Sequence, residues 1–348
     1  MATTSSLTVN ASKVASTLTD YPAYVDLSEM PAAFWAEVAN GGGDIRVYSD
    51  SGLTTELARE VVSCNTATDT GEMHVKVPSL TTSTVIYVTT DGVSSEPAAA
   101  STYGSENVWT EYALVMHNGA SIDATGNGNY TSTSNLTPGD STGPLGAATD
   151  YAAADAISTL YNPDEDAMTI SLWLNGNSNL NTAATDNNQF VYHRSANRNF
   201  SWNWAYDTDD INGRWYDTSN AILADTTWSG PNSVLGTSGW HYGVNSRDDT
   251  AEIAYQYWDG VERAETTTFS GTGSHGVPSV PMSISYLGDN NDEWNGLVAE
   301  FRVAHTQLDP DWIITEYNNQ SDVATFWTVA DEGGGGVTKN ALFFGGGM

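Results

Sequence analysis

Basic residues are scarce in this chain of 348 residues. It has 11 lysines and arginines against 43 aspartates and glutamates, which gives a formal net charge of −32. Its lysines are Lys13, Lys76 and Lys339. Nucleic-acid phosphates and anionic lipid head groups are neutralised by lysine and arginine, so the composition argues against both as partners. We expect no nucleic acid among the partners of this protein.

Cysteine and long apolar runs are scarce as well. Cys64 is the single cysteine, so the chain forms no intrachain disulfide. No run of about 18 apolar residues is present that could span a bilayer, and we expect no membrane insertion. The first ten residues lack the basic and apolar segments of a secretory signal. These features predict assembly in a reducing cytoplasm.

The chain is rich in residues that favour β-structure. Apolar residues make up 39% and aromatic residues 11%, which argues for a folded protein despite the charge. Short runs of alternating aromatic or β-branched residues are separated by Thr, Ser, Gly and Asn. We expect strands at 23–27, 45–49, 56–63, 74–78, 84–90, 112–117, 169–174, 189–194, 200–206, 240–245, 253–258, 282–287 and 297–304.

Few helices are expected. One is a short helix over 31–38, which starts at Pro31 and stops at a run of glycines. A second helix begins at Asp309, a good N-cap, followed by Pro310 at the first helical position.

The pattern predicts an all-β protein in four parts. Residues 1–20 are expected to form an N-terminal arm, and residues 21–103 a small β-sandwich. Residues 104–332 are expected to form a larger jelly-roll sandwich of two stacked antiparallel sheets. Residues 333–348 form a glycine-rich tail.

Two stretches resemble known families. The first resembles the DUF2341 family, through Tyr21–Leu27, Gly43–Val47 and His74–Leu80. The second resembles LamG-type (concanavalin A-like) jelly rolls, through Asp123–Asn129, Thr169–Trp173, Gly239–Val244, Trp258–Gly260 and Gly296–Val303. The resemblance implies a sandwich often found in adhesive, carbohydrate-binding and virion proteins, without implying an activity.

Most of the residues that carry this resemblance have a structural explanation. Trp240 and Trp258 are expected to pack between the sheets, and Asp259-Gly260 to make a hairpin turn. Glu300 and Arg302 are expected to share one face of a strand as an exposed ion pair, worth at most about 1 kcal/mol.

Motifs for catalysis are not found. The sequence lacks the Glu-x-Asp-x-x-Glu pattern of glycoside hydrolases that share this sandwich fold. It also lacks the Gly-x-Ser-x-Gly motif of serine hydrolases, and no two histidines have the i,i+4 spacing of a zinc site. We therefore predict no enzyme, no catalytic residues, no metal ligands and no cofactor. Calcium stays open, because Asp164–Asp166 and Asp289–Glu293 place oxygen ligands in loops, although such loops also arise from acidic composition alone.

Aromatic side chains are the strongest candidates for ligand binding. Strand alternation places Trp202, Trp204 and Tyr206 on one face, and Trp215 and Tyr216 follow on the next segment. Sugars stack on such rings, so these five residues are a candidate glycan-binding platform. The alternative is that the same stripe faces inward as the core of the sandwich.

The tail carries a second candidate. Leu342, Phe343 and Phe344 lie between glycine runs, and such an apolar group on a flexible segment can dock into a pocket of a partner. The alternative is an unattached tail. We favour docking, with other virion proteins of the capsid or tail as partners.

The two families resembled here are typical of proteins that make contacts outside the cell, yet the chain shows no export signal and has a single cysteine. A virion protein fits all three observations, because it is assembled inside the host cell and released by lysis. The strong negative charge suits saline water, where charges are well screened. We predict a structural accessory protein of a marine tailed bacteriophage: a decoration, head-fibre or tail-associated adhesin subunit, with closed homo-oligomers as the default. It would touch host-surface polysaccharide. One alternative is a secreted bacterial lectin or glycoside hydrolase on the same sandwich. Another is a purely structural cement protein that binds no ligand.

Overall fold

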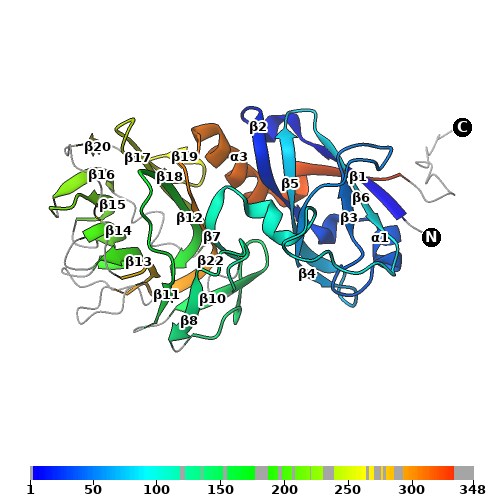
Figure 1. Ribbon diagram of the computed structural model, residues 1–348, viewed down its shortest axis with the longest axis horizontal. Helices are drawn as coiled ribbons and strands as arrows, with labels where there is room; N and C mark the ends of the chain where they lie inside the picture. Colours follow the sequence, from blue (N-terminus) through cyan, green and yellow to red (C-terminus); the bar gives the residue numbers. More distant parts are fainter. Residues whose placement is uncertain are drawn as a thin grey trace, which may run out of the picture.

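The computed structural model describes residues 3–117, 122–134, 136–151, 155–176, 187–194, 198–205, 208–219, 221–229, 239–263, 266–269, 276, 280–285 and 293–332. These residues form four sheets whose strand ladders are antiparallel, which confirms the predicted all-β fold. Figure 1 shows the sheets gathered into two lobes that lie side by side along the longest axis.

The small sandwich is the lobe that contains the N-terminal strand. One of its sheets has the order β23 (Trp327–Asp331), β1 (Thr3–Val9), β6 (Val85–Thr90) and β3 (Arg46–Tyr48). The other has the order β2 (Leu18–Asp26), β5 (Thr70–Leu80) and β4 (Arg59–Asn65). Apolar side chains from both sheets are buried in one core. The short helical elements of this region are η1 (Ala11–Lys13), η2 (Leu27–Glu29), α1 (Ala32–Glu37) and η3 (Ser105–Trp109).

The prediction that residues 1–20 form a separate N-terminal arm is wrong. β1 is an inner strand, in which Leu7 pairs with Val329 of β23 and Ile86 of β6. Leu7 and Val9 are buried, and their burial holds this segment in the sheet. The strand was missed because its serines and threonines leave only two strongly apolar positions.

The expected boundary of the second region at 104–332 is also wrong at its end. β23 lies within that range, yet it completes the small sandwich by pairing with β1 over five residue pairs. The chain therefore crosses to the large sandwich and returns to the small one, and the two lobes are tied together by this return.

The large sandwich is built from two eight-stranded sheets. The first has the order β19 (Val261–Glu262), β18 (Ile253–Trp258), β17 (His241–Asp248), β12 (Ala167–Gly176), β22 (Gly296–Ala304), β10 (Ala147–Tyr151) and β9 (Ser141–Thr142), with β7 (Tyr112–Met116) also paired with β22. The second has the order β20 (Thr266–Phe269), β16 (Ile222–Ser229), β15 (Asp210–Tyr216), β14 (Arg198–Ala205), β13 (Asn187–Arg194), β21 (Ser283–Ile284), β11 (Ala156–Thr159) and β8 (Tyr130–Ser134).

β12 lies between two apolar cores. Leu172 and Leu174 face the interior of the large sandwich, whereas Trp173 faces the core shared with the small sandwich. Because successive side chains of a strand point to opposite faces, a strand covered on both sides is apolar at nearly every position. This explains the buried run from Met168 to Leu174.

Helix α3 (Pro310–Ser321), followed by α4 (Val323–Phe326), connects the lobes. The side chain of Asn319 accepts a hydrogen bond from the Tyr24 backbone N–H at 2.7 Å and donates to the Tyr24 carbonyl at 3.0 Å. On the large sandwich, the indole N–H of Trp173 donates to Gln320 at 2.6 Å. In the described part of the chain, no helix has the length and apolar character needed to cross a membrane.

Both predicted helices are confirmed. α1 covers most of 31–38. At the start of α3, the carboxylate of Asp309 accepts a hydrogen bond from the Asp311 backbone N–H at 2.8 Å, with Pro310 in the first turn.

Candidate functional site

Three of the aromatic residues predicted as a glycan platform, Trp202, Trp204 and Trp215, lie in the core of the large sandwich. Trp202 and Trp215 have no exposed surface, Trp204 is 2% exposed and Tyr216 is 7% exposed. Trp202 packs against Trp258, with ring centroids 5.7 Å apart. Sugars stack on exposed rings, so the platform prediction is wrong for these four residues. The core alternative is correct for Trp202, Trp204 and Trp215. Tyr216 is buried but is not part of that core. Tyr206 lies outside the described residues.

Two other predicted sites also fall partly outside the described residues. Leu342, Phe343 and Phe344 lie there, as does most of the loop Asp289–Glu293. The other candidate calcium loop, Asp164–Asp166, is described. His305 contacts Glu165 at 3.1 Å, and the guanidinium of Arg247 donates to the Glu165 carbonyl at 2.7 Å. This loop is thus held by hydrogen bonds to two neighbouring elements.

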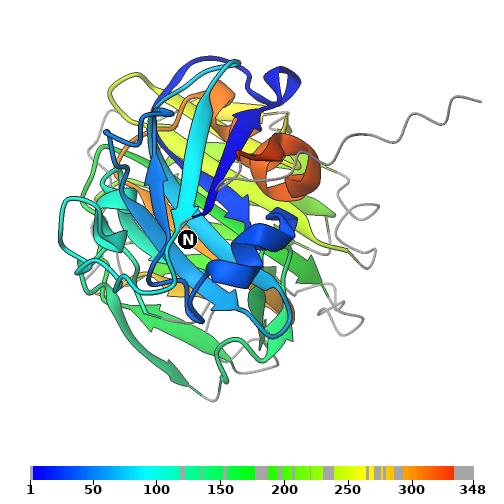
Figure 2. The same cartoon turned by 90° about the vertical axis from the view of Figure 1, so that its right-hand side faces the viewer.

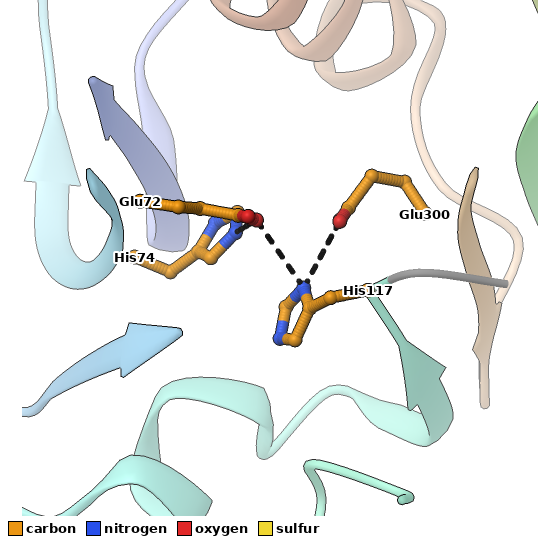
Figure 3. Close-up of side chains that lie close together, drawn as sticks. All are labelled: Glu72, His74, His117 and Glu300. Atoms are coloured by element: carbon orange, nitrogen blue, oxygen red, sulfur yellow. Dashed lines mark hydrogen bonds and ion pairs between the residues drawn. The ribbon is translucent and has the colours of Figure 1, made fainter. Parts of the chain in front are cut away.

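The structure brings together four titratable side chains from three separate stretches of the sequence (Figure 3). Glu72 and His74 come from β5 of the small sandwich. His117 directly follows β7, and Glu300 lies on β22 of the large sandwich. One ligating atom from each of the four lies within 4.8 Å of the others. We call this group the interlobe cluster.

Short contacts link the members of the interlobe cluster. Nδ1 of His117 lies 3.1 Å from Oε1 of Glu300 and 3.7 Å from Oε1 of Glu72. Nε2 of His74 lies 3.2 Å from the same Glu72 oxygen. The two imidazole rings stack at a centroid distance of 4.9 Å. All four side chains are buried.

Strand geometry places these residues. Glu72 and His74 are two residues apart on β5, so both point to the same face. On β22, the register against β12 shifts next to Glu300, and Glu300 itself has a left-handed φ of 51°. Such a bulge re-aims side chains, and non-glycine residues hold this conformation only where their surroundings enforce it. The backbone N–H of Glu300 donates to the His117 carbonyl at 2.8 Å.

A wider set of charged side chains surrounds the interlobe cluster. Arg302 contacts Glu300 at 2.5 Å and Glu316 of α3 at 2.6 Å. Glu316 also accepts a hydrogen bond from the Tyr242 hydroxyl at 2.6 Å. Nε2 of His117 lies 3.1 Å from Oε2 of Glu60, which accepts from the Trp109 indole N–H at 2.5 Å.

The predicted exposed pair is therefore a buried one. Glu300 and Arg302 share a face of β22 as expected, but each is only 1% exposed. The prediction failed because α3 and the small sandwich cover this face of the sheet.

The pKa values of the two cluster carboxyl groups are shifted in opposite directions, upward for Glu72 and downward for Glu300. Burial raises the pKa of Glu72, and the Glu300 carboxylate raises it further. Burial alone would raise the pKa of Glu300, but His117 and Arg302 hold it below its usual value.

The pKa values of the two histidines are also shifted in opposite directions, downward for His74 and upward for His117. Burial lowers the pKa of His74, with a further lowering by the charge of His117. Burial alone would lower the pKa of His117, but the carboxylates of Glu300 and Glu60 raise it well above the usual value. The cluster thus favours a neutral His74 beside a charged His117.

A pocket of about 440 Å³ opens onto the interlobe cluster. Glu72 and His117 line it, while the buried His74 and Glu300 lie behind them. The rest of its wall comes from β4 and from residues of the large sandwich: Glu60, Val61, Val62, Ser63, Ile122, Ala124 and Ala147.

No family model matches the chain, and no curated protein does. Among solved structures, the binding domain of botulinum neurotoxin serotype D is similar, at 12% identity and a TM-score of 0.48, over 60% of this chain and 51% of that one. The binding domain of Paraclostridial Mosquitocidal Protein 1 is similar at 14% identity and a TM-score of 0.47, with the same coverage. The match thus spans about half the length of those chains. Likeness at this level carries no conclusion about function.

Sequence reasoning did not find the interlobe cluster. Two local signals were present, because Glu72-x-His74 and Glu300-x-Arg302 each place two charged or titratable side chains on one face of an apolar strand. What the sequence did not show is that the two strands face each other across the lobes.

Proposed function

We propose that this chain is a structural accessory protein of a tailed-bacteriophage virion, a decoration, head-fibre or tail-associated subunit anchored through the small sandwich. One observation supports this most directly. The first described strand, β1, and the last, β23, are neighbours in one sheet. In Figures 1 and 2 that sheet lies in the lobe away from β13–β16 of the large sandwich.

Such an arrangement suits attachment at one end and display at the other. The start of β1 and the end of β23 lie side by side, since Ser5 pairs with Asp331, and the sequence after Glu332 carries Leu342, Phe343 and Phe344. Docking of these residues on a particle would direct the large sandwich outward. This is the orientation required of an adhesin.

The anchoring role is tested on particles. Virions produced by a genome that encodes this chain are purified and examined by mass spectrometry and immunogold electron microscopy. We expect the chain in stoichiometric amount, and loss of attachment when the chain is truncated after Glu332. A matched control replaces residues 333–348 with a Gly/Ser segment that retains Leu342, Phe343 and Phe344. Absence of the chain from virions, or normal attachment of the truncated chain, would contradict the proposal.

Host-surface glycan contact is the second part of the proposal, and we assign it to the pocket that opens onto the interlobe cluster. Carboxylates and a hydroxyl line the pocket next to Val61, Val62 and Ile122. Sugars need this mixture, because their hydroxyls donate to polar acceptors while their C–H faces pack on apolar groups.

Filling the pocket tests this assignment. Ser63→Trp places a large ring in it, and Ser83→Trp is the control at another exposed serine. We expect S63W to weaken binding to polysaccharide purified from the host bacterium at least tenfold, with S83W unchanged. Equal binding by both variants would exclude this pocket.

A glycoside hydrolase is the alternative that one observation favours. Glu60 and Glu72 line the same pocket, and burial raises the pKa of Glu72, as in a general acid. Release of reducing ends from the host polysaccharide, abolished in E72Q, would establish this alternative and contradict a non-enzymatic role.

A further inference from the structure

We infer that Glu72, His74, His117 and Glu300 form a binding site for one divalent transition-metal ion, of which Zn²⁺ is the best-suited example. The site would join the two lobes, because two ligands come from β5 and two from the segments at β7 and β22. This inference is independent of where the protein is anchored.

The first argument is the donor set and its spacing. Two imidazoles and two carboxylates are a combination that zinc accepts in four-coordinate sites. With metal–ligand distances of about 2.0–2.1 Å, neighbouring ligand atoms of a tetrahedral site lie about 3.4 Å apart. Three of the contacts among the cluster atoms, at 3.1, 3.2 and 3.7 Å, bracket this distance, and all four ligand atoms lie within 4.8 Å of one another.

The second argument is charge. Four carboxylates meet here, from Glu60, Glu72, Glu300 and Glu316, whereas Arg302 is the one permanently charged cation among their described contacts. With His74 neutral and His117 charged, Arg302 and His117 together still leave about two of the four carboxylates without a compensating cation in a mostly buried region. Buried charge of this kind is costly unless a cation or protons neutralise it. A divalent ion between Glu72 and Glu300 removes most of it.

The third argument is the surroundings of the ligands. Histidines that bind metals usually direct the other ring nitrogen to a carboxylate or carbonyl. Nδ1 of His117 faces the cluster, and its Nε2 lies 3.1 Å from Glu60, which is in turn held by Trp109. Arg302 holds Glu300 in the same way. Outer contacts of the kind found at metal sites are therefore in place for His117 and Glu300.

A fourth observation concerns His74. This side chain has no exposed surface, and its Nδ1 has no hydrogen-bond partner within the described residues. A buried polar atom without a partner is unusual. Because Nε2 is the ring atom that contacts Glu72, an ion in the cluster would bind Nε2, and His74 would lack the outer contact that His117 has.

The pocket supplies a route for the ion. Glu72 and His117 are both cluster members and pocket-lining residues, so an ion entering from solvent reaches these two ligands first. Entry requires no separation of the lobes.

Metal binding by the full-length protein is the decisive test. The protein is treated with EDTA, dialysed and titrated with Zn²⁺ at neutral pH by calorimetry, with metal content measured by mass spectrometry. We expect one ion per chain, a higher Tm, and the absorption bands of four-coordinate Co²⁺ when cobalt is used instead. Ca²⁺ and Mg²⁺ should not compete, because they avoid nitrogen ligands. No saturable Zn²⁺ binding by the folded wild-type protein would overturn the inference.

Variants then assign the site. His117→Gln and Glu72→Gln should each weaken Zn²⁺ binding at least a hundredfold. Glu60→Gln, in a positioning residue, should weaken it about 10- to 100-fold. His305→Gln is the control, since His305 is exposed and pairs with Glu165 elsewhere. Unchanged binding in both H117Q and E72Q, with native circular dichroism, would place the ion elsewhere. If these variants fail to fold, the wild-type stoichiometry and cobalt spectrum decide.

Discussion

Arg302 shows how much a single side chain depends on its surroundings in this molecule. Its guanidinium is buried between Glu300 and Glu316 and lies over the Trp109 ring at 4.9 Å. Two carboxylates from different elements thus share this cation, and Glu300 also pairs with His117. Removing it leaves both charges buried, and this cost exceeds the value of the ion pair itself.

Arg302→Met should therefore lower the free energy of unfolding by about 3–5 kcal/mol. The control is Arg214→Met, because Arg214 pairs with Asp225 but its side chain is 38% exposed. There we expect a loss within about 1 kcal/mol. Urea unfolding of the three proteins measures both values, and equal losses would show that Arg302 has no special role.

Asp91 shows how hydrogen bonds near the surface change the pKa of a single carboxyl group. Hydrogen bonds from the Ser94 hydroxyl and from the backbone N–H groups of Ser94 and Val93 lower the pKa of Asp91 to about 2. A lowered carboxyl pKa contributes stability above the unfolded-state value of about 3.9, and this contribution is lost as pH falls towards 2.

Wild type should thus exceed Asp91→Asn in stability by a constant amount above about pH 5, and the difference should shrink between about pH 4 and pH 2. Urea unfolding of both proteins across this range tests it. A difference that does not change with pH would mean that the carboxylate charge is not responsible.

At the scale of elements, α3 is the piece that joins the sandwiches. Its Asn319 makes two hydrogen bonds to the backbone of Tyr24, and its Gln320 accepts from Trp173. Polar side chains inside an interface are tolerated only when their hydrogen bonds are complete. The helix thus adds directional contacts to a junction that is otherwise apolar.

Asn319→Ala should lower the free energy of unfolding by about 2 kcal/mol, since it leaves the buried Tyr24 N–H without its partner. The neighbouring Asn318→Ala removes a half-buried hydrogen bond to the Lys13 carbonyl and should cost about 1 kcal/mol or less. Chemical denaturation compares the two. A larger loss in N318A would argue against the role assigned to Asn319.

For the whole molecule, the dominant electrostatic fact is the net charge of −32. Like charges on one compact body repel one another, and expansion on unfolding relieves this repulsion. Salt screens it, because the Debye length falls from about 30 Å at 0.01 M to about 4–5 Å at 0.5 M.

We expect Tm to rise when NaCl is increased from about 10 mM to about 500 mM, because screening favours the compact state. Differential scanning calorimetry measures the change, and an uncharged osmolyte of equal osmolality is the control. A Tm that falls with salt would indicate that local ion pairs outweigh the overall repulsion.

The sequence alone determined the all-β class, both helices and most central strands, because alternation and capping are local patterns. It left Trp202 and Trp215 open between a ligand platform and a core, since alternation defines faces without saying which face is covered. Strand β1 and the return of β23 depend on pairing between residues more than 300 positions apart. The interlobe cluster needs β5, β7 and β22 to meet. Only the tertiary structure decided these points, because they rest on contacts between strands that no local pattern encodes.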